Sequence, residues 1–191
     1  MLSQTTALLN QTLQAKKDDT KPWARGGVFK QLGVNYRGSP IILDERTTED
    51  VRGSPYSNDD GRICAGDRSP DAPGLIDSSG KQTRLFDMFK PWLHTVLIFG
   101  DDLAPAVLPA LKQYSEKTIQ AFCIMPRDRS SSAQSHTVAV LEDHDGHAYT
   151  GYAVNRARST VIVVRPDGVI GAVAFGVEGT ERYFDGIFVG V

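Results

Sequence analysis

Residues 159–175, STVIVVRPDGVIGAVAF, constrain the fold of this chain more than any other segment. Two apolar runs rich in β-branched residues flank the sequence Arg165-Pro166-Asp167-Gly168. β-Branched residues favour strands, and an Asp-Gly step between two such runs is a strong signal for a tight turn. The segment therefore predicts a β-hairpin near the C-terminal end of the sequence.

The segments before this hairpin alternate between strand and helix patterns. Residues 94–100, HTVLIFG, are a continuous apolar run, typical of a central strand covered on both faces. Residues 103–118 have apolar side chains at helical spacing, and residues 119–125 have strand character. Residues 75–89 and 136–153 each predict a strand, a turn and a short helix. The order βαβαβαββ predicts an α/β fold with a mixed sheet flanked by helices.

A stretch rich in proline and aspartate marks the start of this domain. Residues 65–75, AGDRSPDAPGL, contain a Ser-Pro step and a Pro-Gly step, which suit neither a helix nor an interior strand. We therefore expect a folded domain at residues 65–191, preceded by an N-terminal arm and linker at residues 1–64.

The arm has its own local signals. Residues 2–15 place four leucines near one helical face and predict a short amphipathic helix, while Ile41–Leu43 predicts a short strand. Residues 45–62 are polar and predict a surface connector. Because the arm has too few apolar residues for a core of its own, we expect it to pack on the domain or on a second subunit.

Composition excludes several partners. The net charge is −2, so no basic field is available for nucleic acid or an anionic membrane. The first residues lack a secretory pattern, and no apolar run reaches membrane-spanning length. The two cysteines, Cys64 and Cys123, are far apart and suit free thiols in a reducing compartment. We therefore expect a cytoplasmic protein with no nucleic-acid or membrane partner.

Several of these segments resemble a known family. Residues 66–100, followed by VLEDHDG at 140–146 and TVIVVRPDGVIGAV at 160–173, are similar to the C-terminal domain of flavin-dependent aromatic hydroxylases of the phenol hydroxylase type. This resemblance implies a thioredoxin-like fold standing alone without the FAD module. It also implies that residues 1–64 correspond to the end of a flavin module and its linker. The resembled domain is linked with subunit association, which implies a homodimer here.

The sequence lacks the residues that flavin chemistry and thiol–disulfide exchange require. The sequence has no Gly-x-Gly-x-x-Gly turn, which a dinucleotide needs for close approach of backbone amides to its pyrophosphate. Thioredoxins carry a Cys-x-x-Cys pair at a helix N-terminus, where the thiol pKa is lowered. The corresponding position, directly after the predicted central strand, reads Gly100-Asp101-Asp102-Leu103. We therefore expect no cofactor and no thiol chemistry.

Asp101 and Asp102 are the leading candidate site residues. They stand after a strand and before a helix, at the edge where open α/β sheets bind ligands. Either they cap the helix and favour its dipole, or one of them is a general base. If there is an active site, we expect Tyr36 or Arg37 from the arm to hold an oxyanion or phenolate beside them. His94 begins the central strand at its other end and is expected at the surface or half-buried.

A second polar cluster, residues 142–147, reads EDHDGH and suggests a metal site at first sight. A turn this short points its side chains in different directions, and no third ligand segment has suitable spacing. We therefore expect no metal. Trp23 and Trp92 can cover either a pocket or an interface, and an exposed tryptophan would favour a partner surface.

Two functions from different classes follow. The first is an accessory or dimerisation module, associated with itself or with a flavin monooxygenase, in aromatic or polyketide secondary metabolism as the resemblance implies. The second is a cofactor-independent isomerase, cyclase or dehydratase that binds a small aromatic ligand and acts by general acid–base catalysis. A pocket with converging polar side chains would favour the enzyme, and a closed domain with an apolar face would favour the module.

Overall fold

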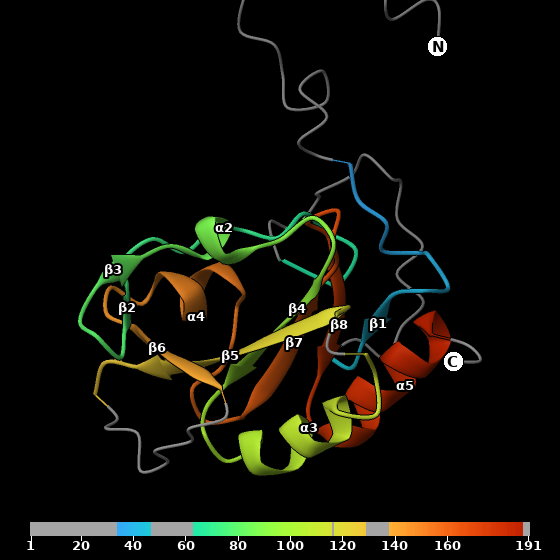
Figure 1. Ribbon diagram of the computed structural model, residues 1–191. Coiled ribbons are helices and arrows are strands. Elements are labelled where there is room, and N and C mark those ends of the chain that lie inside the picture. The colour runs from blue at the N-terminus through green and yellow to red at the C-terminus, as the bar shows by residue number, and fades with distance from the viewer. Residues whose placement is uncertain (1–33, 47–62, 116, 129–137, 189–191) are drawn as a thin grey trace, which may run out of the picture.

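The computed structural model describes residues 34–46, 63–115, 117–128 and 138–188. Within these ranges eight strands form one sheet in the order β1-β8-β7-β4-β5-β6-β2-β3 (Figure 1). The pairs β1–β8, β4–β5 and β5–β6 are parallel, and the other pairs are antiparallel. The strands are β1 (Leu43–Asp44), β2 (Leu75–Asp77), β3 (Gln82–Thr83), β4 (His94–Phe99), β5 (Ile119–Pro126), β6 (Ala139–Asp143), β7 (Thr160–Val164) and β8 (Ile170–Ala174). The mixed sheet flanked by helices confirms the predicted thioredoxin-like α/β fold.

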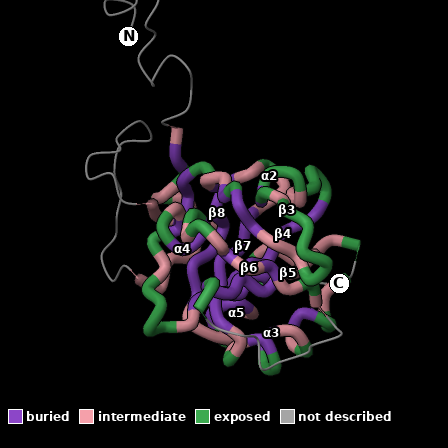
Figure 2. The backbone as a smooth tube through the Cα atoms, turned by 90° about the vertical axis from the view of Figure 1, so that its left-hand side faces the viewer, coloured by how far each residue is buried: buried purple, intermediate pink, exposed green. Residues whose placement is uncertain are grey.

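The predicted hairpin and central strand form the middle of the sheet. Strands β7 and β8 pair through a turn in which Gly168 has a φ of 78°, a conformation that glycine adopts without strain. Strand β4 lies between β7 and β5, and all six of its residues are buried. Figure 2 shows this buried centre as a continuous set of strands. Apolar runs without alternation are therefore explained by burial on both faces.

Two pairs of helices cover the two faces of the sheet. The short helices α2 (Leu85–Met88) and α4 (His147–Gly151) lie above the strands in the view of Figure 1, and α3 (Ala104–Leu111) and α5 (Val177–Ile187) lie below them. Each side has its own apolar cluster, centred on Phe99 and Tyr152 on the first side and on Val107 and Phe184 on the second. In the part of the chain that the structure describes, no helix is both long and apolar enough to cross a membrane.

Helix α5 is an element that the predicted order βαβαβαββ omits. Its sequence, VEGTERYFDGI, contains two glycines, which weaken the helical signal. Gly179 leaves room for the Glu45 carboxylate, since a Cβ there would lie 2.5 Å from the Glu45 Oε1 atom. The helix buries Tyr183 and Phe184 in the apolar cluster that it shares with α3 and β8. Helix α3 also ends at Leu111, earlier than the predicted 118.

Part of the predicted arm belongs to the sheet. The strand expected at Ile41–Leu43 is found as the two-residue β1, which shares only Leu43 with that range and pairs with β8 in parallel. The Glu45 carboxylate accepts a hydrogen bond from the Phe175 backbone N–H at 2.8 Å and pairs with Arg182 at 2.7 Å. The predicted helix at residues 2–15 and most of the predicted connector at 45–62 lie outside the described residues.

Candidate functional site

The parallel strands β4, β5 and β6 end at one edge of the sheet, called here the carboxyl edge. Asp101, Arg127 and His144 follow these three strands directly or within two residues. Strand β7 is antiparallel to β4, so Arg158 and Ser159, which precede it, reach the same edge. Ligands of open α/β sheets bind at such an edge, because the loops there are free of the sheet's own hydrogen bonding.

The two candidate aspartates lie at this edge, before α3. Leu103 is the N-cap residue of α3 and makes no side-chain capping bond, so neither aspartate occupies the N-cap position, although both precede the positive end of the helix dipole. Asp102 instead accepts a hydrogen bond from the Ser159 hydroxyl at 2.5 Å. Gly100 permits this contact, because its φ is 93° and a Cβ there would lie 2.9 Å from Ser159 Oγ.

The thiols of the chain are not activated. Burial, with a smaller effect of the Asp101 charge, raises the pKa of Cys123 to about 11. Cys123 is 4% exposed inside β5, which confirms the expectation of a core thiol. Burial also raises the pKa of Cys64. Because the thiolate is the reactive form, neither cysteine has the lowered pKa that disulfide exchange uses.

A hollow of about 450 Å³ lies where β5 and β6 end and is called here the carboxyl-edge hollow; neither Asp101 nor Asp102 lines it. Charged side chains of both signs line it, together with Gly146: Arg127, Asp128, Asp143, His144, Asp145 and Arg156. No group of three metal-ligating side chains lies together within the described ranges. The mixed charges suit a polar ligand better than an apolar one.

Asp143 is the most constrained of these side chains. It is 1% exposed, and its Oδ2 atom accepts a hydrogen bond from the Tyr149 backbone N–H at 2.9 Å. Its Oδ1 atom is buried and has no hydrogen-bond partner among the described residues. The Tyr149 ring lies 5.6 Å from the Arg156 guanidinium, and its hydroxyl donates to the Ile124 carbonyl at 3.2 Å. A buried carboxylate oxygen without a donor is costly, which makes this atom a candidate for ligand or water contact.

Tyr36 and Arg37 lie elsewhere. The Tyr36 backbone N–H donates to the Gly66 carbonyl, and the Gly66 N–H donates to Ile170 at the start of β8. Ile170 pairs with Val164, which pairs with Thr95 near the start of β4. Asp101 follows the other end of β4, and a strand of this length spans about 20 Å. The structure therefore does not bring Tyr36 and Arg37 together with Asp101 and Asp102.

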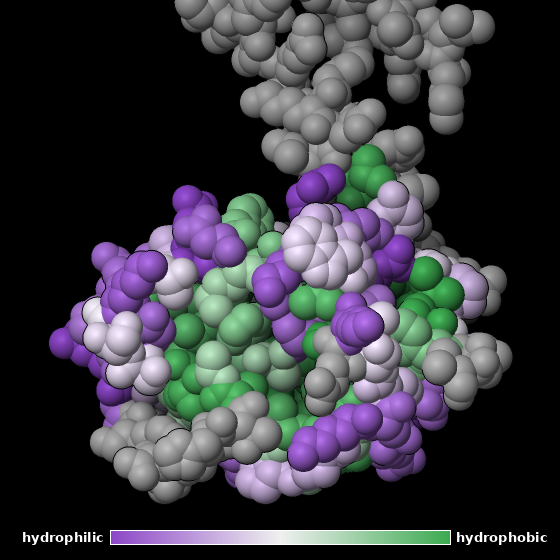
Figure 3. Space-filling view, in the orientation of Figure 1, coloured by the Kyte–Doolittle hydropathy of each residue, from purple (hydrophilic) through white to green (hydrophobic). Residues whose placement is uncertain are grey.

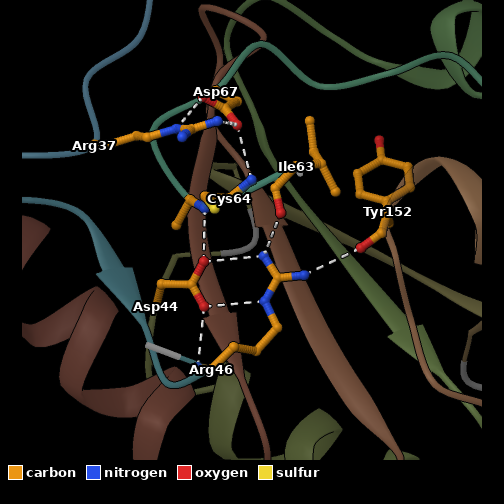
Figure 4. A network of polar contacts seen from close by, with 8 residues as sticks. Arg37, Asp44, Arg46, Ile63, Cys64, Asp67 and Tyr152 are labelled. Atoms are coloured by element: carbon orange, nitrogen blue, oxygen red, sulfur yellow. Dashed lines mark hydrogen bonds and ion pairs between the residues drawn. The ribbon is translucent and has the colours of Figure 1, made fainter. Parts of the chain in front are cut away.

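Arg37 has a structural role in a network between the arm and the domain (Figure 4). Its guanidinium forms two bonds of 2.8 Å with the Asp67 carboxylate, and both side chains are only 9% exposed. Asp67 also accepts the Cys64 N–H at 2.8 Å. Nearby, Asp44 pairs with Arg46 at 2.9 Å, and Arg46 donates to the carbonyls of Ile63 and Tyr152. These bonds hold residues 35–46 against the domain.

His94 differs from expectation. It is only 9% exposed, so the prediction of a surface or half-buried position is wrong. Its ring lies edge-on to Phe184 and Phe188, with centroids 5.7 and 5.6 Å away. Burial, helped by the charge of Arg165, lowers the pKa of His94.

Sequence reasoning missed Ser159, Arg156 and the buried state of Asp143. The signal for Ser159 was its place before β7, opposite the end of β4, which an antiparallel β4–β7 pair would have brought beside Asp102. The sequence indicated only that Asp143 belongs to a polar turn, because a run of polar residues gives no sign of which side chain is buried. Arg156 had no signal in the sequence.

Residues 110–190 match the family model of the phenol hydroxylase C-terminal dimerisation domain. The chain resembles that domain. The resemblance inferred from the quoted segments is thereby confirmed. No curated protein matches the chain.

Solved structures show the same fold at low sequence identity. Aklavinone-11 hydroxylase, solved with FAD and aklavinone, matches with a TM-score of 0.59 and 19% identity over 85% of this chain. The match covers 27% of that hydroxylase, so the chain spans about a quarter of its length. The thioredoxin domain of a thiol-disulfide oxidoreductase from Bacteroides vulgatus matches with a TM-score of 0.54 and 15% identity, over 65% of this chain and 98% of that one. A domain of a possible thiol-disulfide isomerase from Cytophaga hutchinsonii matches with a TM-score of 0.53 and 17% identity, over 64% and 92% of the two chains.

Proposed function

We propose that this chain is a thioredoxin-like association module without thiol chemistry, and that it forms a homodimer. The observation that carries this proposal is an exposed aromatic side chain: Trp92 is 66% exposed, more than any other large apolar side chain of the described residues. Exposed aromatic residues of this size are typical of protein contact surfaces. The match to a dimerisation domain supports self-association.

The carboxyl edge supports the absence of thiol exchange. Asp101 and Asp102 occupy the position of the dithiol, and both cysteines have raised pKa values. We expect the protein not to reduce insulin disulfides, and the double variant Cys64→Ser/Cys123→Ser to keep its oligomeric state. Turbidity measured during insulin reduction tests the first point, with a Cys-x-x-Cys thioredoxin as the positive control. Insulin reduction by this protein would refute this part of the proposal.

Light scattering of the full chain tests the homodimer. We expect a mass twice the 20.8 kDa of one chain at micromolar concentration. A mass of one chain across the concentration range would reject self-association, and a complex formed only with a flavin monooxygenase would replace the homodimer with a heterologous partner. The resemblance supports a role in aromatic or polyketide secondary metabolism. Flavin-dependent hydroxylases of such pathways are therefore the partners to test for complex formation.

A second function, acid–base catalysis on a small aromatic molecule, is favoured by the unpartnered Oδ1 atom of Asp143 at the carboxyl-edge hollow. In this function Asp101 or Asp102 is the base inferred from the sequence, and Tyr36 and Arg37 are too distant to act with it. Calorimetric titration with phenolic compounds tests it. Binding that Asp143→Asn weakens would support a ligand site, and no heat at millimolar compound would reject it.

A further inference from the structure

The segment from α2 to the start of β4 carries two exposed aromatic side chains. Phe86 in α2 is 48% exposed and Trp92, in the segment that joins α2 to β4, is 66% exposed. Half-buried Met88, Phe89 and Phe122 pack against the core cluster on this side of the sheet, and the Phe86 and Phe89 rings lie 5.9 Å apart. We call these five residues the α2 face. Aromatic residues and methionine are enriched at protein–protein contacts, where they bury large areas at low entropic cost.

The strand beside the α2 face is poorly covered for its place in the sheet. β5 has paired strands on both sides, yet its first four residues, Ile119–Phe122, are only half-buried. Gln120 links this strand to α2, since its amide donates to the Met88 carbonyl at 2.8 Å. In the orientation of Figure 1, the space-filling view shows a hollowed apolar surface below α2 that continues toward β5 and β6 (Figure 3). On the side of the sheet that α2 covers, Phe122 of β5 therefore extends the α2 face, whereas Ile119 and Ala121 pack against the cluster on the opposite side.

The charges on this surface are suited to contact with an identical surface. Asp87 and Lys90 flank Met88 and Phe89, both are exposed, and neither has a hydrogen-bond or ion-pair partner among the described side chains. The third charge, Arg84, is already paired with Asp71. In a two-fold symmetric interface, a contact between residue i of one copy and residue j of the other occurs twice. Asp87 of each copy can therefore pair with Lys90 of the other. A surface with one unpaired charge of each sign meets a second copy without like-charge repulsion.

We propose that the α2 face is the surface through which a second copy of this chain binds. This inference rests on the homodimer proposed above and adds where and how it forms. The apolar residues of the two α2 faces pack at the centre of the interface, and two reciprocal Asp87–Lys90 contacts flank it. The interface is isologous, and each pair of charges occurs twice.

Charge reversal in the full chain tests this geometry. Asp87→Lys places like charges at both reciprocal contacts, and so does Lys90→Asp. We expect each single variant to raise the dimer Kd by about five- to thirty-fold, because like charges replace two ion pairs. The swap Asp87→Lys/Lys90→Asp restores opposite charges and should return the Kd close to that of the wild type. Glu178→Lys, an exposed charge on α5 across the sheet, is the matched control and should leave the Kd unchanged.

The apolar centre is tested by Trp92→Ser, for which we expect a Kd at least about thirty-fold higher, as for other central aromatic contacts. Sedimentation velocity gives each Kd, and far-UV circular dichroism checks that the variants fold. A dimer whose Kd none of these variants changes would overturn the α2 face and leave the homodimer intact. A wild-type monomer would refute the homodimer itself. A monomer in which the fluorescence of Trp92, measured in a Trp23→Phe background, is shielded from iodide would show that this chain's own arm covers the face, which also overturns the inference.

Discussion

The substitution Gly171→Ala should destabilise the domain through one contact in the middle of β8. A Cβ at Gly171 would lie 2.2 Å from the Tyr183 hydroxyl oxygen, 2.6 Å from its Cζ atom and 3.0 Å from Arg165 Cγ. These distances are far shorter than a van der Waals contact, so Tyr183 must move. The φ angle of Gly171 does not lie in the left-handed region. An alanine at this position is therefore opposed by lack of space and not by the backbone conformation.

Tyr183 has little room to move. It is 4% exposed, and its ring contacts His94 and Phe184 with centroids 6.1 and 5.2 Å away. Adding a buried carbon to a packed site of this kind costs about 1–3 kcal/mol of the free energy of unfolding. The Tyr183 hydroxyl also has no hydrogen-bond partner among the described residues, so Tyr183→Phe should be neutral or stabilising by about 1 kcal/mol. The double variant Gly171→Ala/Tyr183→Phe should recover only part of the stability lost in Gly171→Ala, because the Cζ atom of residue 183 still lies close to the added Cβ.

Urea unfolding followed by circular dichroism measures these differences. The matched control is Gly186→Ala in α5, where a Cβ meets nothing within 4 Å. There alanine should stabilise the helix by up to about 1 kcal/mol, since it is the better helix former. The same chemical change should thus have opposite signs at the two positions. Equal stabilities of the Gly171→Ala and Gly186→Ala variants would refute the packing argument.

Two further predictions concern buried charge. Because burial lowers the pKa of His94, the unfolded chain binds its proton more readily, and stability should fall as the pH drops below about 6.5 by up to about 1.4 kcal/mol per unit, levelling off below the folded-state pKa. The free energy of unfolding of His94→Phe should not show this dependence on pH, whereas that of His147→Phe, at an exposed site, should keep it. Equal pH dependence of the two variants would contradict the assignment to His94. Asp67→Ala should cost about 3–5 kcal/mol, because it leaves the buried Arg37 guanidinium without its carboxylate, whereas Asp128→Ala, in an exposed pair, should cost about 1 kcal/mol or less. Chemical unfolding decides this, and similar losses for both variants would show that burial does not strengthen the Arg37–Asp67 pair.

The sequence by itself determined the elements whose signals are local. The runs at β4, β7 and β8 are apolar over their whole length, and the Asp167-Gly168 step defines the turn between β7 and β8. Such patterns depend on neighbouring residues alone, so strand type and order could be predicted. The Gly-Asp-Asp-Leu stretch after β4 likewise excluded a dithiol without any coordinates.

Tertiary structure alone decided which residues meet. Gly179 weakened the helical signal of α5, and only the structure shows that the Glu45 carboxylate of a distant segment packs against it. Tyr36 and Arg37 were expected beside Asp101, but backbone hydrogen bonds to Gly66 and the Asp67 ion pair hold them near the start of β4. These contacts join residues about 30 positions or more apart, and each depends on the full set of strand pairings. The exposure of Trp92 has the same origin, because a tryptophan is buried or exposed according to what the rest of the chain leaves uncovered.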